Sequence, residues 1–161
     1  FWWGHMGWFL CDDPRRAKCT ALDLARDPVH LFLNRTQGLW PLLLGILLYA
    51  VGGLPWLIWG LSVRTVVVYH VTWLVNSAAH TWGYQSYQTA DRSTNNWWVA
   101  LLSFGEGWHN NHHAFPRSAA HGLRWWELDL TYLTIRALEV LGLAKNIVVP
   151  DKTRLASEEG T

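Results

Sequence analysis

One long stretch of the chain is almost free of charge. No charged residue occurs between Arg35 and Arg64, and residues 39–51 are apolar on every helical face. An amphipathic helix of a soluble protein would carry a polar face, so this pattern is typical of a helix in lipid. The breaker Gly52-Gly53-Leu54-Pro55 follows, and residues 56–79 are again mostly apolar, with Arg64 as their one charged residue. The pattern predicts a transmembrane helical hairpin over about 38–80.

The first apolar run is shorter than the roughly 20 residues that cross a bilayer. A helix in this region must therefore extend into residues 31–38, or it does not cross the whole bilayer. A hairpin places both of its ends on one side of the membrane. Basic residues flank it on both ends, and by the positive-inside bias that side is cytoplasmic or, in a plastid, stromal. These residues are Arg15, Arg16, Lys18, Arg26 and Arg35 before the hairpin and Arg92, Arg117, Arg124 and Lys145 after it.

The pattern changes after the hairpin. Residues 84–96 are polar and turn-like, and residues 97–104 are apolar and expected at the membrane interface. Residues 125–143 repeat apolar positions at helical spacing, which predicts an amphipathic helix. We expect one all-α domain of a polytopic membrane protein, in which residues 81–150 form a helical, cytoplasm-facing, metal-binding cap. Residues 151–161 are expected to be a flexible tail.

Composition supports the membrane assignment. Thirteen tryptophans are many for 161 residues, and tryptophan concentrates where apolar chain meets lipid headgroups. The net charge of +1 comes without a basic stripe, so nucleic acid is not an expected partner. Cys11 and Cys19 are expected to be reduced. The sequon Asn34-Arg35-Thr36 is discounted because it falls on the cytoplasmic side. The chain opens on an aromatic stretch without a leader pattern, and we expect it to be a fragment of a longer protein.

The segment Gly107-Trp108-His109-Asn110-Asn111-His112-His113 carries the candidate chemistry. Its histidines stand at i, i+3 and i+4, so on a helical turn they share one face and can converge on one or two metal ions. The alternative is a cluster of surface polar side chains, which we consider weaker for three histidines beside membrane helices. Asn76 and His80 lie four residues apart at the end of the second apolar run, so a continuous helix would point them the same way. His80 is therefore a candidate fourth ligand.

These motifs resemble the membrane Δ9 fatty-acyl desaturases. The resemblance rests on residues 72–80 (TWLVNSAAH) and 105–116 (GEGWHNNHHAFP), and it covers most of the chain. Residues 95–98 (NNWW) and 121–126 (HGLRWW) are more similar to the cyanobacterial and plastid-type branch than to the animal acyl-CoA branch. In that family two irons are held by three histidine boxes, one further histidine and a water-binding asparagine.

The resemblance implies a role for each matching residue. His109, His112 and His113 match the last box, His80 the additional histidine and Asn76 the asparagine, whereas the first two boxes are absent from the chain. It implies a fatty-acyl substrate on CoA, acyl carrier protein or a glycerolipid, with O2 as co-substrate. The expected cofactor is two iron ions, and the electron donor is ferredoxin or a cytochrome b5. Desaturation of an unactivated methylene needs oxygen activated at a redox metal, and imidazoles suit iron.

The remaining titratable residues near the motifs receive other assignments. His5, His30 and His70 have no partner at ligand spacing and are expected to pack or to form hydrogen bonds. His121 matches no family ligand and is expected to contact a ligand at most. Glu106 stands three residues before His109, as in carboxylate di-iron bundles, but those need two such copies and further carboxylates. We expect Glu106 to orient an imidazole.

Three alternatives compete with desaturation. A histidine-box acyl or alkane hydroxylase shares the iron chemistry but inserts oxygen, and the combination of Asn76, His80 and the HNNHH box argues against it. A zinc metalloprotease would need a glutamate inside the motif, where this chain has asparagine. A non-catalytic metal-binding or transport protein would need polar residues within the bilayer, and the first apolar run has none.

Overall fold

The computed structural model describes residues 1–11, 22–151 and 155. The chain divides into two compact units, one formed by residues 11–69 and the other by residues 1–10 together with 70–161. Each unit is described by itself. Three of the basic residues invoked for membrane sidedness, Arg15, Arg16 and Lys18, lie outside the described residues, as do Cys19 and most of the expected tail.

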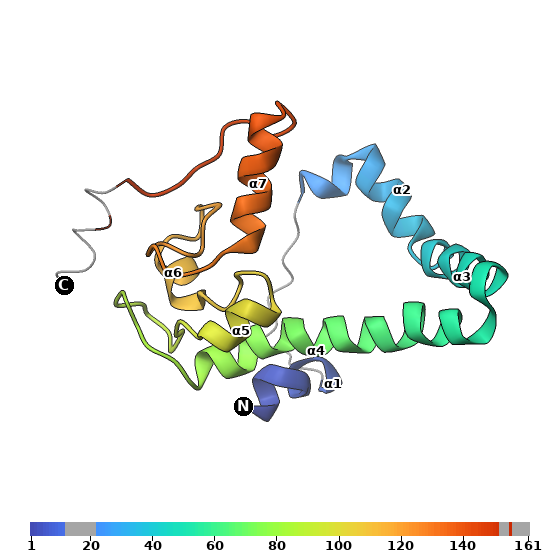
Figure 1. The fold of residues 1–161 in the computed structure, drawn as a ribbon, viewed down its shortest axis with the longest axis horizontal. Coiled ribbons are helices and arrows are strands. Elements are labelled where there is room, and N and C mark those ends of the chain that lie inside the picture. The colour runs from blue at the N-terminus through green and yellow to red at the C-terminus, as the bar shows by residue number, and fades with distance from the viewer. Residues whose placement is uncertain (12–21, 152–154, 156–161) are drawn as a thin grey trace. The chain divides into compact units, whose positions relative to one another are not determined.

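The unit of residues 11–69 contains a short capped helix and an apolar helical hairpin (Figure 1). Helix α2 spans Pro28–Thr36, and it begins there because the Asp27 side chain accepts from the backbone N–H groups of Val29 and His30. Helix α3 spans Leu39–Leu57 and is followed by a π-helical segment, Ile58–Val63, and by α4, Arg64–Ser77, whose residues from 70 onward belong to the other unit.

Gly53 reverses the chain within α3. Its backbone lies at φ +66° and ψ −158°, which is not helical and which glycine adopts without a steric cost. The arms on either side pack closely, since a β-carbon on Gly45 would lie 3.3 Å from the Leu61 side chain, and one on Gly60 would lie 3.0 Å from that of Leu48. The tight turn expected at residues 52–55 is therefore confirmed, and its placement in a membrane remains a prediction.

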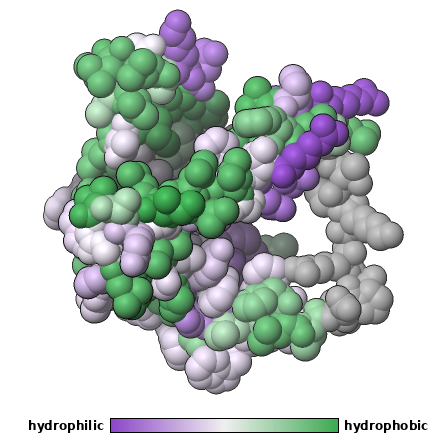
Figure 2. All heavy atoms as spheres, turned by 90° about the vertical axis from the view of Figure 1, so that its right-hand side faces the viewer, coloured by the Kyte–Doolittle hydropathy of each residue, from purple (hydrophilic) through white to green (hydrophobic). Residues whose placement is uncertain are grey.

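The surface of the hairpin is apolar. The helical run Leu39–His80 is long and apolar enough to cross a membrane, and only 6% of its most apolar window is buried within the protein. Outward-facing side chains include Leu42, Ile46, Leu47, Val51 and Trp59, each more than half exposed. Figure 2 shows apolar side chains spread over the face that it draws. Because water would disfavour such a surface, lipid is the environment that it fits.

The second unit gathers short helices around the end of α4. A π-helical segment, Trp3–Gly7, and α1, Trp8–Leu10, open the chain, and a 3-10 turn, Ala78–His80, follows α4. Helices α5, Trp97–Leu102, α6, His109–Ala114, and α7, Leu130–Val140, complete the unit (Figure 1). Val75, Ala78 and Val99 form its buried apolar core. Among the described residues the only extended pairings are the isolated bridges Tyr84–Asn95 and Asn95–Trp108.

The all-helical prediction is confirmed for the described residues, but one boundary was wrong. The amphipathic helix begins at Leu130 rather than near Trp125. Asp129 ends the preceding loop, because its side chain accepts from the backbone N–H of Tyr132 at 2.8 Å and caps the helix. Residues 125–129 form turns instead, among which Glu127 and Asp129 are buried. The apolar spacing could not reveal that buried acids organise this loop.

Candidate metal centre

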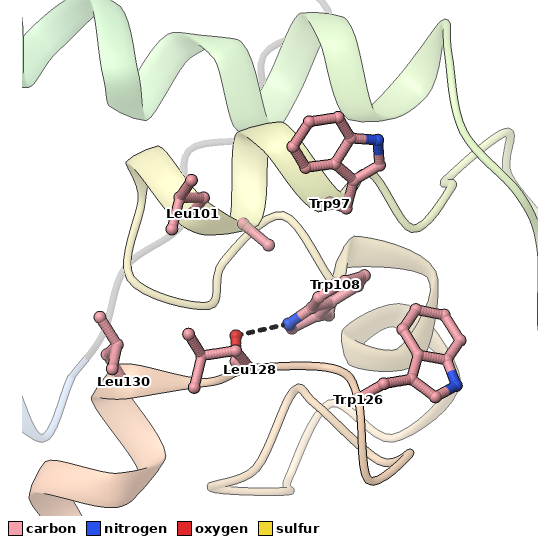
Figure 3. A pocket seen from close by; sticks show the side chains of 7 residues that line it. Trp97, Leu101, Trp108, Trp126, Leu128 and Leu130 are labelled. Carbon is pink, nitrogen blue, oxygen red and sulfur yellow. Dashed lines mark hydrogen bonds between the residues drawn. The ribbon is translucent and has the colours of Figure 1, made fainter.

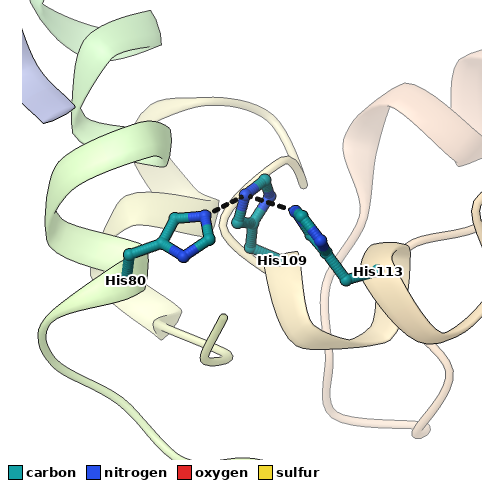
Figure 4. A group of neighbouring side chains, drawn as sticks. All are labelled: His80, His109 and His113. Atoms are coloured by element: carbon teal, nitrogen blue, oxygen red, sulfur yellow. Dashed lines mark hydrogen bonds between the residues drawn. The ribbon is translucent and has the colours of Figure 1, made fainter. Parts of the chain in front are cut away.

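Three of the predicted histidines converge. His109 and His113 lie one turn apart on α6, and His80 approaches from the end of the 3-10 turn (Figure 4). The His109 Nε2 atom lies 3.0 Å from His80 Nε2 and 3.0 Å from His113 Nε2. The three atoms available for coordination lie within 4.8 Å of one another, and the His109 side chain is buried.

This arrangement fits a metal ion better than it fits a set of hydrogen bonds. An imidazole nitrogen carries either one proton or one lone pair, so His109 Nε2 can form only one good hydrogen bond to its two neighbours. Nitrogens about 2.1 Å from one ion at right angles would stand about 3 Å apart, which is close to the spacing seen. Imidazole donors suit iron among other transition metals.

The charge state of the cluster also favours coordination. Burial, followed by the charges of the neighbouring imidazoles His113, His80 and His112, lowers the pKa of His109 to about 3. Burial lowers the pKa of His112 as well, with His121 and His113 adding to the effect. Both imidazoles are therefore neutral near pH 7, which is the form that offers a lone pair to a metal.

His80 reaches the cluster by a route that differs from the sequence argument. The sequence predicts one continuous α-helix through residues 76–80, but α4 ends at Ser77 and residues 78–80 form a 3-10 turn. The assumption of a continuous helix was wrong, and because a 3-10 turn rotates each residue further than an α-helix does, the shared direction of Asn76 and His80 stays a prediction. The Asn76 side chain is exposed, and its water-holding role remains a prediction.

His112 does not converge with the other three. Its ring lies against His121, with centroids 4.6 Å apart, and its buried Nδ1 atom has no hydrogen-bond partner among the described residues. His121 Nδ1 in turn lies 3.6 Å from a Glu106 carboxylate oxygen. Glu106 thus faces an imidazole, as expected, but that imidazole belongs to His121 rather than to the cluster. Metal binding by His112 remains a prediction, as does the role of Glu106 in orienting an imidazole of the metal site.

The two asparagines between the histidines hold α6 in place. Asn110 Oδ1 accepts from the backbone N–H groups of Ser86 and Tyr87, and its Nδ2 donates to the Tyr87 carbonyl. Asn111 exchanges hydrogen bonds with Asn95, whose Nδ2 donates to Asn111 Oδ1 at 2.7 Å. Both are essentially fully buried. The asparagine side chains of α6 therefore bind neighbouring loops, whereas His109 and His113 on the same helix converge with His80.

A buried carboxylate completes this support. Glu127 accepts from Asn111 Nδ2 and from the backbone N–H groups of Leu123 and Arg124, and its other oxygen accepts from the Tyr84 hydroxyl at 2.7 Å. A buried carboxylate is stable only with such donors. Burial raises the pKa of Tyr84, and the hydrogen bond and charge of Glu127 raise it further.

One residue of the site escaped the sequence reasoning. An Asp91 carboxylate oxygen, Oδ2, contacts His113 Nδ1, on the side of the ring away from the cluster. Burial opposes the charge of Asp91, but hydrogen bonds from Ser93, the charge of His113 and a hydrogen bond from Thr89 outweigh it and lower the pKa to about 2. Asp91 lies in a polar loop without a recognisable motif, so no sequence signal would have identified it.

The other histidines have structural contacts, as expected. His5 Nδ1 lies 2.9 Å from Ser77 Oγ, and His5 Nε2 lies 3.0 Å from His70 Nδ1. His30 Nδ1 lies 3.3 Å from an Asp27 oxygen on the surface of α2. These contacts are of the hydrogen-bonding kind that the sequence analysis assigned to them.

An apolar pocket of about 180 Å³ lies near the histidine box (Figure 3). Trp108, the residue before His109, forms part of its wall and donates from its indole N–H to the Leu128 carbonyl at 2.9 Å. The lining contains no titratable side chain, so the pocket is suited to bury hydrocarbon. The residues that line it are Trp97, Ala100, Leu101, Trp108, Trp126, Leu128 and Leu130.

Comparison with known proteins identifies the family of the chain. The family model described as fatty acid desaturase matches residues 2–143. The chain is 53% identical to the sn-1 stearoyl-lipid 9-desaturase of Anabaena variabilis, over 94% of this chain and 57% of the relative. It is 50% identical to the enzyme of the same name from Synechocystis, over 98% of this chain and 50% of the relative.

A plastid enzyme is also similar. The palmitoyl-monogalactosyldiacylglycerol delta-7 desaturase, chloroplastic, of Arabidopsis thaliana is 49% identical over 96% of this chain and 43% of its own length. The chain therefore spans about half the length of the curated relatives that it matches. The match over nearly the whole chain, including every residue of the histidine cluster, shows that the chain belongs to the fatty acid desaturase family.

Proposed function

We propose that the whole protein is an oxygen-dependent fatty-acyl desaturase that introduces a cis double bond at the Δ9 position of a saturated, lipid-linked acyl chain. The observation that carries the proposal is the convergence of three imidazole nitrogens, from His80, His109 and His113, at spacings of 3.0 Å around His109. Two of the similar cyanobacterial proteins are named stearoyl-lipid 9-desaturases, which supports both the position and the substrate class.

The reaction removes two hydrogens from adjacent methylenes. In balanced form, the –CH2–CH2– unit, O2, two electrons and two protons give –CH=CH– and two waters. Iron bound at the histidines supplies the oxygen activation that no amino-acid side chain can provide. His80, His109 and His113 would hold the metal through ring nitrogens, and the buried position of His109 limits the access of water to that side of the site.

The finer assignments extend the same proposal. His112, and Asn76 through a water molecule, belong to a two-iron set whose other ligands lie outside these residues. Electrons come from ferredoxin or a cytochrome b5. The apolar hairpin is a membrane hairpin, and the histidines face the cytoplasm or stroma. The exposed apolar surface of α3 supports membrane insertion.

The test is expression of the complete open reading frame in a host that lacks its own desaturase. Mass spectrometry of the lipids is expected to find a cis double bond at carbon 9. His109→Ala is expected to abolish the product, because it removes the central nitrogen of the cluster, whereas His30→Ala, a surface histidine beside Asp27, is expected to leave it unchanged. A hydroxylated product, or saturated lipids unchanged by an iron-loaded protein, would contradict the proposal.

A further inference from the structure

Both ring nitrogens of His113 have a partner in the protein. Its Nε2 atom lies 3.0 Å from His109 Nε2 in the cluster, while its Nδ1 atom contacts Asp91 Oδ2. A carboxylate that accepts from Nδ1–H fixes the proton on that nitrogen and leaves the lone pair on Nε2. The contact therefore selects the tautomer in which His113 can donate to an ion at the cluster.

Asp91 is itself held by its own loop. Its other oxygen, Oδ1, accepts from the Thr89 hydroxyl at 3.1 Å and from the Ser93 backbone N–H at 2.9 Å. One oxygen thus closes a turn of the Asx type and the second is left for His113. The carboxylate is fixed by the fold rather than by the imidazole that it faces.

The histidine box anchors the same loop. Asn110 accepts from Ser86 and Tyr87 and donates to the Tyr87 carbonyl and, at 3.4 Å, to the Thr89 hydroxyl. A closed circuit therefore runs from Asn110 through the loop to Asp91 and back to His113 on the same helix. Such a circuit fixes both the tautomer and the ring orientation of the imidazole.

We propose that Asp91 is a positioning residue, which orients His113 as a metal ligand by holding the proton on Nδ1. The proposal rests on the proposed function, because it assumes an ion at the cluster. Carboxylates that accept from a metal-bound imidazole commonly change metal affinity or activity by about 10- to 100-fold when they are removed.

Asp91→Asn in the product of the complete open reading frame tests the proposal. Asparagine keeps an oxygen for Thr89 and Ser93, so the turn is expected to survive, but its amide N–H would face His113 Nδ1 and favour the wrong tautomer. We expect iron release to a chelator to become 10- to 100-fold faster, and the spectrum of the Co(II)-substituted protein to change. The matched control is Asp27→Asn, which alters another carboxylate beside a histidine and should change neither measurement.

A double variant separates positioning from general destabilisation. If Asp91 acts through His113, adding Asp91→Asn to His113→Ala should cause no further loss of iron. If Asp91→Asn fails to fold, Asp91→Ala replaces it, and added formate should restore iron retention by supplying the carboxylate. Wild-type iron release and an unchanged Co(II) spectrum would overturn the proposal, as would equal additional losses in the His113→Ala background. These measurements do not depend on product formation, so an inactive protein that binds iron would refute the desaturase proposal alone.

Discussion

Asn111 shows how much of the site depends on single polar side chains. It is 1% exposed. Its side-chain oxygen accepts from Asn95 Nδ2, and its side-chain nitrogen donates to the His121 carbonyl and to the Glu127 carboxylate. Each donor or acceptor left unsatisfied in such a position costs about 1–3 kcal/mol. The fold therefore requires asparagine at position 111, because another side chain would leave buried hydrogen-bonding partners unsatisfied.

We predict that Asn111→Asp destabilises the protein by about 2–4 kcal/mol, because it places a second carboxylate against Glu127 and removes the donor that joins them. The unfolding free energy in detergent measures the effect. Asn34→Asp, at an exposed position of α2, is the control and should change stability by less than about 0.5 kcal/mol. Equal stability of the two variants would show that the Asn111 network contributes nothing.

Tyr84 supplies a prediction about pH. Its pKa is raised by burial and by Glu127, so the folded protein keeps its phenolic proton above pH 10, where the unfolded chain loses it. The hydrogen bond to Glu127 is therefore fully present below pH 10, and stability falls as the pH rises above that value. Ultraviolet titration at pH 11 should give the same tyrosinate signal for the folded wild type and Tyr84→Phe. A smaller signal in the variant would contradict the raised pKa.

Among the elements, α6 depends on close contact with α5. The Gly107 carbonyl accepts from the Asn96 N–H, and a β-carbon on Gly107 would collide with the backbone of Ala100 in α5. Asn96 also caps α5 through its side chain. Only glycine fits at position 107, because its backbone lies against that of Ala100 in α5. This close contact places the start of α6, and with it His109, beside α5.

We expect Gly107→Ala to lower the melting temperature strongly, because backbone atoms of α5 cannot yield as a flexible side chain could. The matched control is Gly38→Ala at the start of α3, where a β-carbon would meet no atom within 4 Å. Thermal unfolding followed by circular dichroism compares the two. A similar melting temperature for both variants would show that α5 and α6 separate more easily than their contacts suggest.

The elements also show what sequence patterns can predict. The apolar runs, the turn at Gly53 and the helical histidine box follow from local spacing, and all three are present. The start of α7 and the 3-10 turn before His80 were not predictable, because they depend on contacts made by Asp129 and by the core around Ala78. Local periodicity carries no information about such contacts.

The same limit applies to the site. Sequence reasoning selected His80, His109 and His113, which the structure brings together, and it also selected His112, which lies against His121 instead. It missed Asp91, because the contact between Asp91 and His113 joins a loop to a helix through the intervening hydrogen bonds of Asn110. Chemistry in a short motif is visible in sequence, whereas its supporting partners are set by tertiary structure.

At the scale of the molecule, the number of converging donors limits the metal content. Three imidazole nitrogens gather within 4.8 Å among the described residues, and two irons would need more ligands than these. We expect the 161 residues alone, purified in detergent, to hold fewer than two irons per chain by plasma mass spectrometry. The product of the complete open reading frame is the comparison and is expected to hold two. Two tightly bound irons in the 161-residue chain would contradict this expectation.

The support of Asn111 by Glu127 has a consequence for how the protein matures. The ribosome makes the histidine box before it makes Glu127 and Asp129, yet Glu127 holds Asn111, and Asp129 Oδ2 accepts from the His121 and Gly122 N–H groups. Helix α6 therefore lacks its final anchors while it is the newest part of the nascent chain. We therefore expect the histidine box to reach the geometry described here only after the downstream segment has been made, so that a metal held there, as proposed above, would gain its final ligand geometry late in biogenesis.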